Sequence, residues 1–163
     1  MRRFYVSPAN IGDQITIHGD EARHIARVLR LQPQEMIIAF DGSGYDYEVK
    51  LLSVSSDEVT GTVLSCILNT TEPPVDITLV QSLAKGDKMD FIIQKAVELG
   101  VNRIIPIQSD HSVVKLDQKR ADDRVRRWNR MAMEACKQCG RSRLPIVEEV
   151  SRLALVLKKS PEI

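Results

Sequence analysis

Apolar and polar positions alternate along the first 72 residues in the way that is typical of short strands. This alternation predicts strands at residues 14–18, 35–40, 45–54 and 59–67. Between the second and third of them, residues 41–44 read Asp-Gly-Ser-Gly, a strong signal for a hairpin turn. The first 72 residues are therefore expected to form a small, mostly β barrel or sandwich.

One helix is predicted within this region, from residue 21 to about residue 31, with Ile25, Val28 and Leu29 as its buried stripe. Arg23, Arg27 and Arg30 recur on one face of it at steps of four and three. Taken alone, such a stripe is more often a solvated surface than a binding site.

The pattern changes after residues 69–74, which are polar and then contain two adjacent prolines. We expect a domain boundary there, with domains at residues 1–72 and 73–163. Strands at 77–81, 103–107 and 146–150 then alternate with helices at 88–99, 117–139 and 153–158, which indicates an α/β domain with a mainly parallel sheet. Only three strands of that sheet are present, so we expect further C-terminal sequence to be missing.

The composition is that of an ordered protein, with 43% hydrophobic and 28% charged residues. The net charge of +1 hides an asymmetry between the two halves. Residues 1–72 contain 6 Lys and Arg against 10 Asp and Glu, whereas residues 73–163 contain 17 against 12. The second half is therefore the expected surface for an anionic partner. No apolar run approaches the roughly 20 residues of a membrane-spanning helix, and we expect a cytoplasmic protein that contacts no membrane.

Two lysines are candidates for a site in the second half. Lys85 follows the first strand of the sheet, where ligands of open α/β sheets bind, and Lys95 lies on the helix that comes next. Asp87 is the expected N-cap of that helix, and Gly100 its left-handed C-terminal residue. The alternative for both lysines is a solvated helix surface.

The second helix of this half has the strongest positive charge. Residues 115–143 contain 10 Lys and Arg against 4 Asp and Glu, which is enough charge to hold RNA. An apolar stripe and a cationic face are predicted on opposite sides of the helix. The stripe comprises Ala121, Val125, Trp128, Ala132, Ala135 and Cys139, and the cations are Arg120, Arg124, Arg127, Arg130, Lys137 and Arg141. A solvated helix with internal acid pairs is the alternative.

Three cysteines without an apolar leader favour a reducing compartment. Cys136 and Cys139 have the spacing of a chelating or redox pair. A zinc site needs about four ligands, and no second pair lies nearby in the sequence, so we expect no metal. No hydrolase triad, phosphate-binding loop or dinucleotide-binding glycine pattern is present.

Several segments, in this order, resemble the RsmE family of 16S rRNA uridine-N3 methyltransferases. They are Arg2, Arg3 and Phe4; His24 with residues 28–31; residues 40–42, 85–90, 94–101, 112–114 and 134–141. The resemblance implies an N-terminal PUA-like β-barrel that binds RNA. It also implies the N-terminal half of a SPOUT methyltransferase domain, an α/β trefoil-knot fold that forms a homodimer and uses S-adenosylmethionine.

By this resemblance, the intact enzyme methylates N3 of a uridine in the decoding region of 16S rRNA within the small ribosomal subunit. Lys95 is the first candidate for a catalytic cation and Lys85 the second. The implied RNA contacts are Arg2, Arg3, Arg27, Arg30, Arg124, Arg127, Arg141 and Arg143.

The sequence departs from the family pattern in two ways. His111 stands where the family usually has Arg. The glycine-rich knot segments that bind the cofactor are not in this sequence, so the chain alone is expected to bind no S-adenosylmethionine and to be inactive. A non-catalytic RNA-binding protein is the main alternative. A third is an unrelated α/β domain that dimerises through the Trp128 helix.

Overall fold

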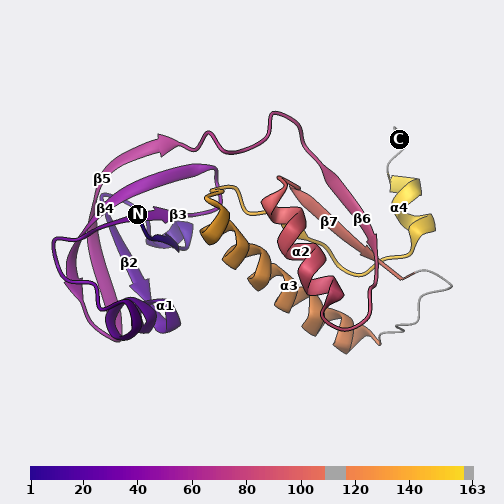
Figure 1. Ribbon diagram of the computed structural model, residues 1–163, viewed down its shortest axis with the longest axis horizontal. Coiled ribbons are helices and arrows are strands. Elements are labelled where there is room, and N and C mark those ends of the chain that lie inside the picture. Colours follow the sequence, from indigo (N-terminus) through magenta and orange to yellow (C-terminus); the bar gives the residue numbers. More distant parts are fainter. Residues whose placement is uncertain (109–116, 160–163) are drawn as a thin grey trace. The chain divides into compact units, whose positions relative to one another are not determined.

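A computed structural model describes residues 1–108 and 117–159 of the chain. The chain divides into two compact units (Figure 1). The first unit comprises Met1–Glu72 together with Gly140–Leu144, and the second comprises Pro73–Cys139 and the chain from Pro145 onward. The sequence pattern gave no sign that Gly140–Leu144, which follows a long helix of the second unit, returns to the first.

The first unit contains one five-stranded sheet that curls into an open half-barrel. Its strand order is β1-β3-β4-β5-β2, so β1 and β2 form the two free edges. The strands are β1 (Arg3–Tyr5), β2 (Gln14–His18), β3 (Met36–Phe40), β4 (Tyr45–Val54) and β5 (Glu58–Leu68). Four of them match the predicted strands closely. The pattern does not predict β1, which is too short to show an alternation and pairs in parallel with β3.

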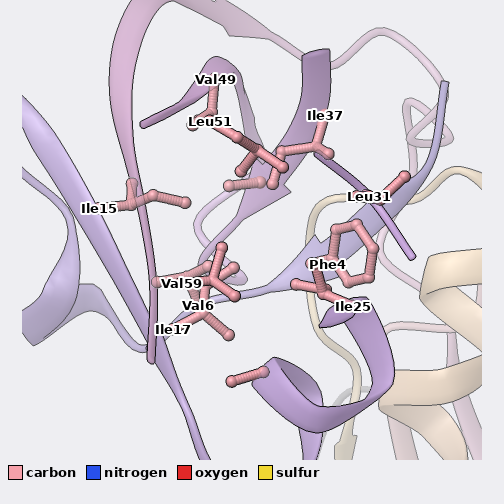
Figure 2. Packing of buried hydrophobic residues seen from close by; sticks show 12 residues of the cluster. Phe4, Val6, Ile15, Ile17, Ile25, Leu31, Ile37, Val49, Leu51 and Val59 are labelled. Atoms are coloured by element: carbon pink, nitrogen blue, oxygen red, sulfur yellow. The ribbon is translucent and has the colours of Figure 1, made fainter. Parts of the chain in front are cut away.

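Alternate residues of these strands point into one apolar core (Figure 2). Ile15 and Ile17 of β2 face Val49 and Leu51 of β4 across this core, and Val59 of β5 joins them. Figure 2 also shows Phe4 of β1, Ile25 and Leu31 closing the core at one end. These residues form the hydrophobic core of the half-barrel.

The predicted helix over residues 21–31 consists of two different short pieces. An α-helix, α1 (Gly19–Arg23), continues directly into a π-helix, η2 (His24–Leu29). The wider turn of a π-helix rotates the residues that follow around the axis. As a result Ile25 is buried as expected, but Val28 is 67% exposed, and the prediction that Val28 is buried is wrong.

The second unit contains a three-stranded parallel sheet in the order β6-β7-β8. The strands are β6 (Thr78–Ser82), β7 (Arg103–Ile107) and β8 (Ile146–Val147). Helices α2 (Lys88–Glu98), α3 (Gln118–Cys139) and α4 (Leu153–Lys159) alternate with them. The predicted α/β alternation is confirmed, although β8 is only two residues long.

Helices α2 and α3 pack against each other through their apolar faces. Met89, Ile93 and Val97 are the buried anchors of α2, and Trp128 is the large buried residue of α3. The apolar pattern of the helix predicts that Leu99 is buried with Met89, Ile92, Ile93 and Ala96, but Leu99 is 77% exposed, because the helix ends at Glu98 and the chain turns through a left-handed Gly100. Asp87 precedes α2 without a capping side-chain hydrogen bond, so the predicted N-cap interaction is wrong. Within residues 1–108 and 117–159, we find no helix with the length and apolarity to cross a membrane.

We predict that Gly61→Ala destabilises the first unit by about 1–3 kcal/mol, the usual cost of overpacking a core. A Cβ at this position would overlap the side chain of Val49 and lie 3.0 Å from the carbonyl oxygen of Lys50. Equilibrium urea unfolding measures the effect. Gly12→Ala is the matched control because its Cβ would meet only ordinary contacts. Equal stabilities of the two variants would contradict the close approach of β4 to β5.

Candidate nucleic-acid interface

Arg141, one of the arginines expected to contact RNA, is buried in the first unit. Only 3% of it is exposed. Its Nε lies 3.2 and 3.1 Å from the two carboxylate oxygens of Glu72, and its Nη2 lies 2.8 Å from Glu72 Oε2. Glu72 also accepts a hydrogen bond of 3.1 Å from the backbone N–H of Arg143. The planar fork of arginine fits such a double contact, which a lysine would not reproduce.

Arg3 is held in a similar way on strand β1. Its Nη1 and Nη2 donate to the two carboxylate oxygens of Asp46 on β4, at 2.9 and 2.8 Å. Nη2 also lies 2.6 Å from Ser142 Oγ, and the guanidinium carbon lies 5.3 Å from the centre of the Phe40 ring. Asn69 donates to both Asp46 Oδ2, at 2.9 Å, and the carbonyl of Gly140, at 3.0 Å.

These hydrogen bonds decide the ionisation of Asp46. Burial alone would raise the pKa of this carboxyl, but the hydrogen bonds from Arg3, Ser142 and Asn69 outweigh burial and lower its pKa below the ordinary value. Asp46 is therefore a permanent anion at neutral pH. It joins the N-terminal strand, the hairpin and the returning segment Gly140–Leu144.

The expectation that Arg3 and Arg141 hold RNA does not fit these positions. Both guanidinium groups are largely shielded from solvent and form ion pairs within the first unit. Releasing either for an RNA phosphate would leave a carboxylate buried without its partner, at a cost of several kcal/mol. Both arginines join distant segments of the first unit through these ion pairs. Arg143 is exposed, and its backbone N–H donates to Glu72.

Three other arginines of the first unit are exposed around helix η2. Arg2 Nη1 donates to the carbonyl of Leu29 at 3.3 Å, and Arg27 Nε donates to Ser56 Oγ at 3.0 Å. Arg30 follows the helix directly. In the described part of the chain none of the three forms an ion pair. Arg23, the first of the three arginines in the predicted stripe, pairs with Asp20 at 3.1 Å.

The cationic face of α3 forms in part: Arg141 was expected on it but lies beyond the end of the helix and is buried in the first unit, and part of the remaining charge is neutralised. Arg120 and Arg126 pair with acids three residues before them, and Arg127 pairs with Asp90 of α2. Arg124 and Arg130 form no ion pair with any residue of the described ranges. The solvated alternative with internal acid pairs is thus correct for part of the helix, and these two arginines retain unpaired charge.

Arg127 borders three surface hollows of the second unit, of about 220, 460 and 670 Å³. The smallest lies between the start of α2 and α3, where Gly86 and Asp87 face Arg124. Trp128, at its base, donates from its indole N–H to Asp90 at 3.2 Å. The hollow of about 460 Å³ is a groove between Gln94 of α2 and the Arg127 and Arg130 side of α3.

The two candidate lysines have different surroundings. Lys95 Nζ lies 2.6 Å from Glu98 Oε2, and 5.8 Å from the ring centre of Phe91, so its charge is already paired. Lys85 is exposed in the loop after β6, next to Gly86 at the smallest hollow. No ion pair involves Lys85 within the described residues. Lys85 lines none of the three hollows but directly precedes Gly86, which lines the smallest one, whereas Lys95 is partly buried on α2 and paired with Glu98.

No group of three or more His, Cys, Asp or Glu side chains converges as a metal site among the residues that the structure describes. Cys136 is buried, Cys139 is partly buried, and both are free thiols. His111 lies outside the described residues, as do Ser112, Val113 and Val114.

Comparisons with known proteins agree with this two-unit architecture. A model of the RNA methyltransferase PUA domain matches residues 17–64, and a model of the RNA methyltransferase domain matches residues 71–163. The ribosomal RNA small subunit methyltransferase E of Bacillus subtilis is 37% identical over 144 residues, which cover 88% of this chain and 56% of that protein. The enzyme of the same name from Aquifex aeolicus is 32% identical and aligns with 99% of this chain and 67% of its own length. The chain belongs to the RsmE family of 16S rRNA methyltransferases.

Solved structures of two proteins described as a methyltransferase and a putative methyltransferase are also similar to this chain. The Neisseria gonorrhoeae enzyme, bound to S-adenosyl methionine, has a TM-score of 0.90 and 36% identity, covering 99% of this chain and 67% of that one. A Legionella pneumophila protein in complex with the same cofactor has a TM-score of 0.87 and 26% identity. The chain spans only 56 to 58% of the length of the Bacillus and Buchnera relatives.

Sequence reasoning missed Asp46, Asn69, Glu72 and Ser142 as the partners of the two buried arginines. Only Glu72 could have been suspected as a partner from the sequence, because it is an acidic residue next to the predicted domain boundary. The others lie up to 139 positions from the arginine they contact, and no local pattern links them.

We predict that Arg141→Ala lowers the free energy of unfolding of the first unit by about 3–5 kcal/mol, because it leaves the largely buried carboxylate of Glu72 without its cationic partner. Urea unfolding of the whole chain, with hydrogen exchange of the β4 amides as the local probe, measures the loss. Arg126→Ala removes an exposed pair and should change stability by about 0–1 kcal/mol. A similar small effect for Arg141→Ala would mean that the buried pair contributes nothing.

We further predict that the stability advantage of the wild type over Asp46→Asn depends on pH. A carboxyl whose folded pKa is lowered stabilises the protein above its unfolded pKa, near about 3.9, and loses this contribution as the pH falls through the folded pKa. The difference in unfolding free energy should be largest near neutral pH and shrink below about pH 4. Unfolding curves recorded across this range test it, and two parallel pH profiles would contradict it.

Proposed function

We propose that this chain provides the RNA-binding unit and the first part of the transferase domain of an enzyme that methylates N3 of a uridine in the decoding region of 16S rRNA. The supporting observation is the match of both family models, in the same order as the two units, together with relatives named ribosomal RNA small subunit methyltransferase E. The proposal includes action in the cytoplasm and, for the full-length enzyme, a homodimer.

The exposed cations supply the contacts to RNA in this proposal. Arg2, Arg27 and Arg30 hold the RNA backbone at the first unit, and Arg124 and Arg127 do so along α3. Arg143 extends the surface of the first unit, and Arg130 extends the surface along α3. Each phosphate contact releases counterions, so affinity should fall steeply with salt.

The chemical step requires N3 of the uracil to lose its proton before or during transfer. A fixed cation close to N3 lowers the barrier because it stabilises the negative charge that develops on the base. Lys85 has the stronger geometric case, since it is exposed, unpaired among the described residues and next to the hollow bordered by Arg124. Lys95 remains a candidate, but its ion pair with Glu98 must first break.

A target base inside folded rRNA must also be flipped out of its base stack before the methyl group can be transferred.

S-adenosylmethionine, when bound, supplies the methyl group as an electrophilic sulfonium. The resemblance assigns cofactor binding to glycine-rich segments that this sequence does not contain, and we assign none of its residues to the cofactor. The roles proposed here are toward the RNA alone.

The second candidate is a non-catalytic RNA-binding protein. It is favoured by the position of the unpaired cations, which explain RNA affinity without any methyl transfer. The two candidates differ in a single observable, the methyl group on the rRNA.

Primer extension on 16S rRNA from a strain that lacks the gene tests the proposal. A methyl group on N3 blocks Watson–Crick pairing and stops the reverse transcriptase, so we expect a stop at a decoding-region uridine in the parent and none in the deletion strain. Complementation with the whole gene should restore it. Complementation with a gene carrying Lys85→Met should slow methylation by roughly 100-fold or more if Lys85 stabilises the transition state.

Lys88→Met is the matched control because Lys88 is an exposed lysine three residues further along the chain, at the start of α2, to which no catalytic role is assigned. An unchanged stop in the deletion strain would refute the enzyme. If the purified chain still bound 16S rRNA, the non-catalytic alternative would stand instead.

A further inference from the structure

The hollow of about 220 Å³ at the start of α2 contains two opposite charges that do not pair with each other. Helices α2 and α3 lie side by side (Figure 1), and Asp87 lines the hollow from the start of α2 while Arg124 lines it from α3. Within residues 1–108 and 117–159 neither side chain forms an ion pair or a hydrogen bond. Either charge alone would be ordinary on a solvated surface. Together they place a hydrogen-bond acceptor and a donor, both without partners, around one small space.

The backbone anchors both of these side chains. Gly86 turns the chain with φ 57°, and the carbonyl of Asp87 accepts the N–H of Phe91 at 3.1 Å. Arg124 lies one helical turn before Trp128, which is buried between the helices, so the two share a face of α3. Asp87 and Arg124 therefore extend toward the hollow from fixed positions.

The other charged groups of the hollow already have partners. Asp90 accepts a hydrogen bond from Arg127 and, at 3.2 Å, one from the indole N–H of Trp128. A ligand that enters the hollow therefore meets Asp87 and Arg124 as the charged groups without partners among the described residues that line it.

The size and chemistry of the hollow select the kind of ligand. Pockets for drug-sized molecules measure roughly 300–1,000 Å³, so this hollow suits a smaller fragment such as a single base. A carboxylate only accepts hydrogen bonds and a guanidinium only donates them. The Watson–Crick edge of uracil matches this pair, because its N3–H is a donor between two carbonyl oxygens. Cytosine would instead turn the lone pair of its N3 toward the carboxylate.

We propose that this hollow holds the N3 edge of a flipped-out uracil, with the carboxylate of Asp87 accepting the hydrogen of N3 and Arg124 donating to an adjacent carbonyl oxygen. This inference rests on the proposed function, since it takes uridine as the target. Arg124 has five N–H donors, so it can contact the base and still face a phosphate of the same strand.

The arrangement also gives the proton of N3 a destination. The N3–H bond breaks, the proton forms an O–H bond on the Asp87 carboxylate, and the electron pair stays on N3. Lys85, two residues before Asp87, is the cation that stabilises the negative charge left on the base. Asp87 therefore both selects uracil and accepts its proton.

Asp87→Asn tests this selection, because an amide can present either an acceptor or a donor to the base. The purified wild-type chain should bind a fluorescein-labelled oligouridylate about tenfold or more tightly than an oligocytidylate of the same length, the discrimination of one good base contact. An oligomer of N3-methyluridylate lacks the N3 hydrogen and should also bind more weakly. In Asp87→Asn the preference for uridylate should disappear. The melting temperature should not change, since the Asp87 side chain makes no capping hydrogen bond.

Asp13→Asn is the matched control, since it removes the same charge from an exposed position of the first unit and should keep the preference. Phosphate contacts elsewhere on the chain contribute equally to the three oligomers, so they cancel in the ratios of affinity. The proposal would be overturned if the wild type bound the three oligomers equally or bound none of them, or if Asp87→Asn kept the preference.

The ratios do not depend on methylation in cells. An rRNA without the methyl group would refute the proposed function and leave the base contact standing, whereas a lost preference would refute the base contact alone.

Discussion

The ion pair between Arg141 and Glu72 is the contact on which the organisation of this chain depends. The chain passes between its two units after Glu72, after Cys139 and after Leu144. Glu72 binds Arg141 and the backbone of Arg143, and Asn69 binds the carbonyl of Gly140. The ends of the segment Gly140–Leu144 and the end of Met1–Glu72 are therefore joined by hydrogen bonds within the first unit. A segment that follows a helix of the second unit thereby becomes part of the half-barrel.

Burying such a pair is costly, because both ions lose their hydration, and the attraction repays this only when further hydrogen bonds satisfy both partners. That condition is met here. The two oxygens of Glu72 accept from three donors, and the neighbouring Asp46 accepts from Arg3, Ser142 and Asn69. The ion pair therefore specifies which segments of the chain pack together and adds little net stability. An apolar contact of similar size could have stabilised the fold as well.

Local order was predictable from the sequence where the pattern is periodic. Strand β4 and the central strand β7 have the bounds that alternation and apolar runs predict, and α3 differs by one residue. Prediction failed where the structure depends on contacts between distant residues. The π-helix moved Val28 to the surface, and Arg3 and Arg141 were counted with the surface cations because their acidic partners are far away in sequence. Spacing alone does not separate a buried arginine from an exposed one.

The arginines of this chain therefore divide by what surrounds them. Arg3 and Arg141 have two or more acceptors from distant segments and join those segments within the first unit. Arg2 and Arg27 are exposed, and their side chains donate only to a carbonyl and to a hydroxyl. The exposed Arg30 has a left-handed backbone that is held by a hydrogen bond to the carbonyl of Ile25 and by the buried residues Ile25 and Leu31. Packing between distant segments therefore decides both which arginines are buried and how the backbone of an exposed one is held.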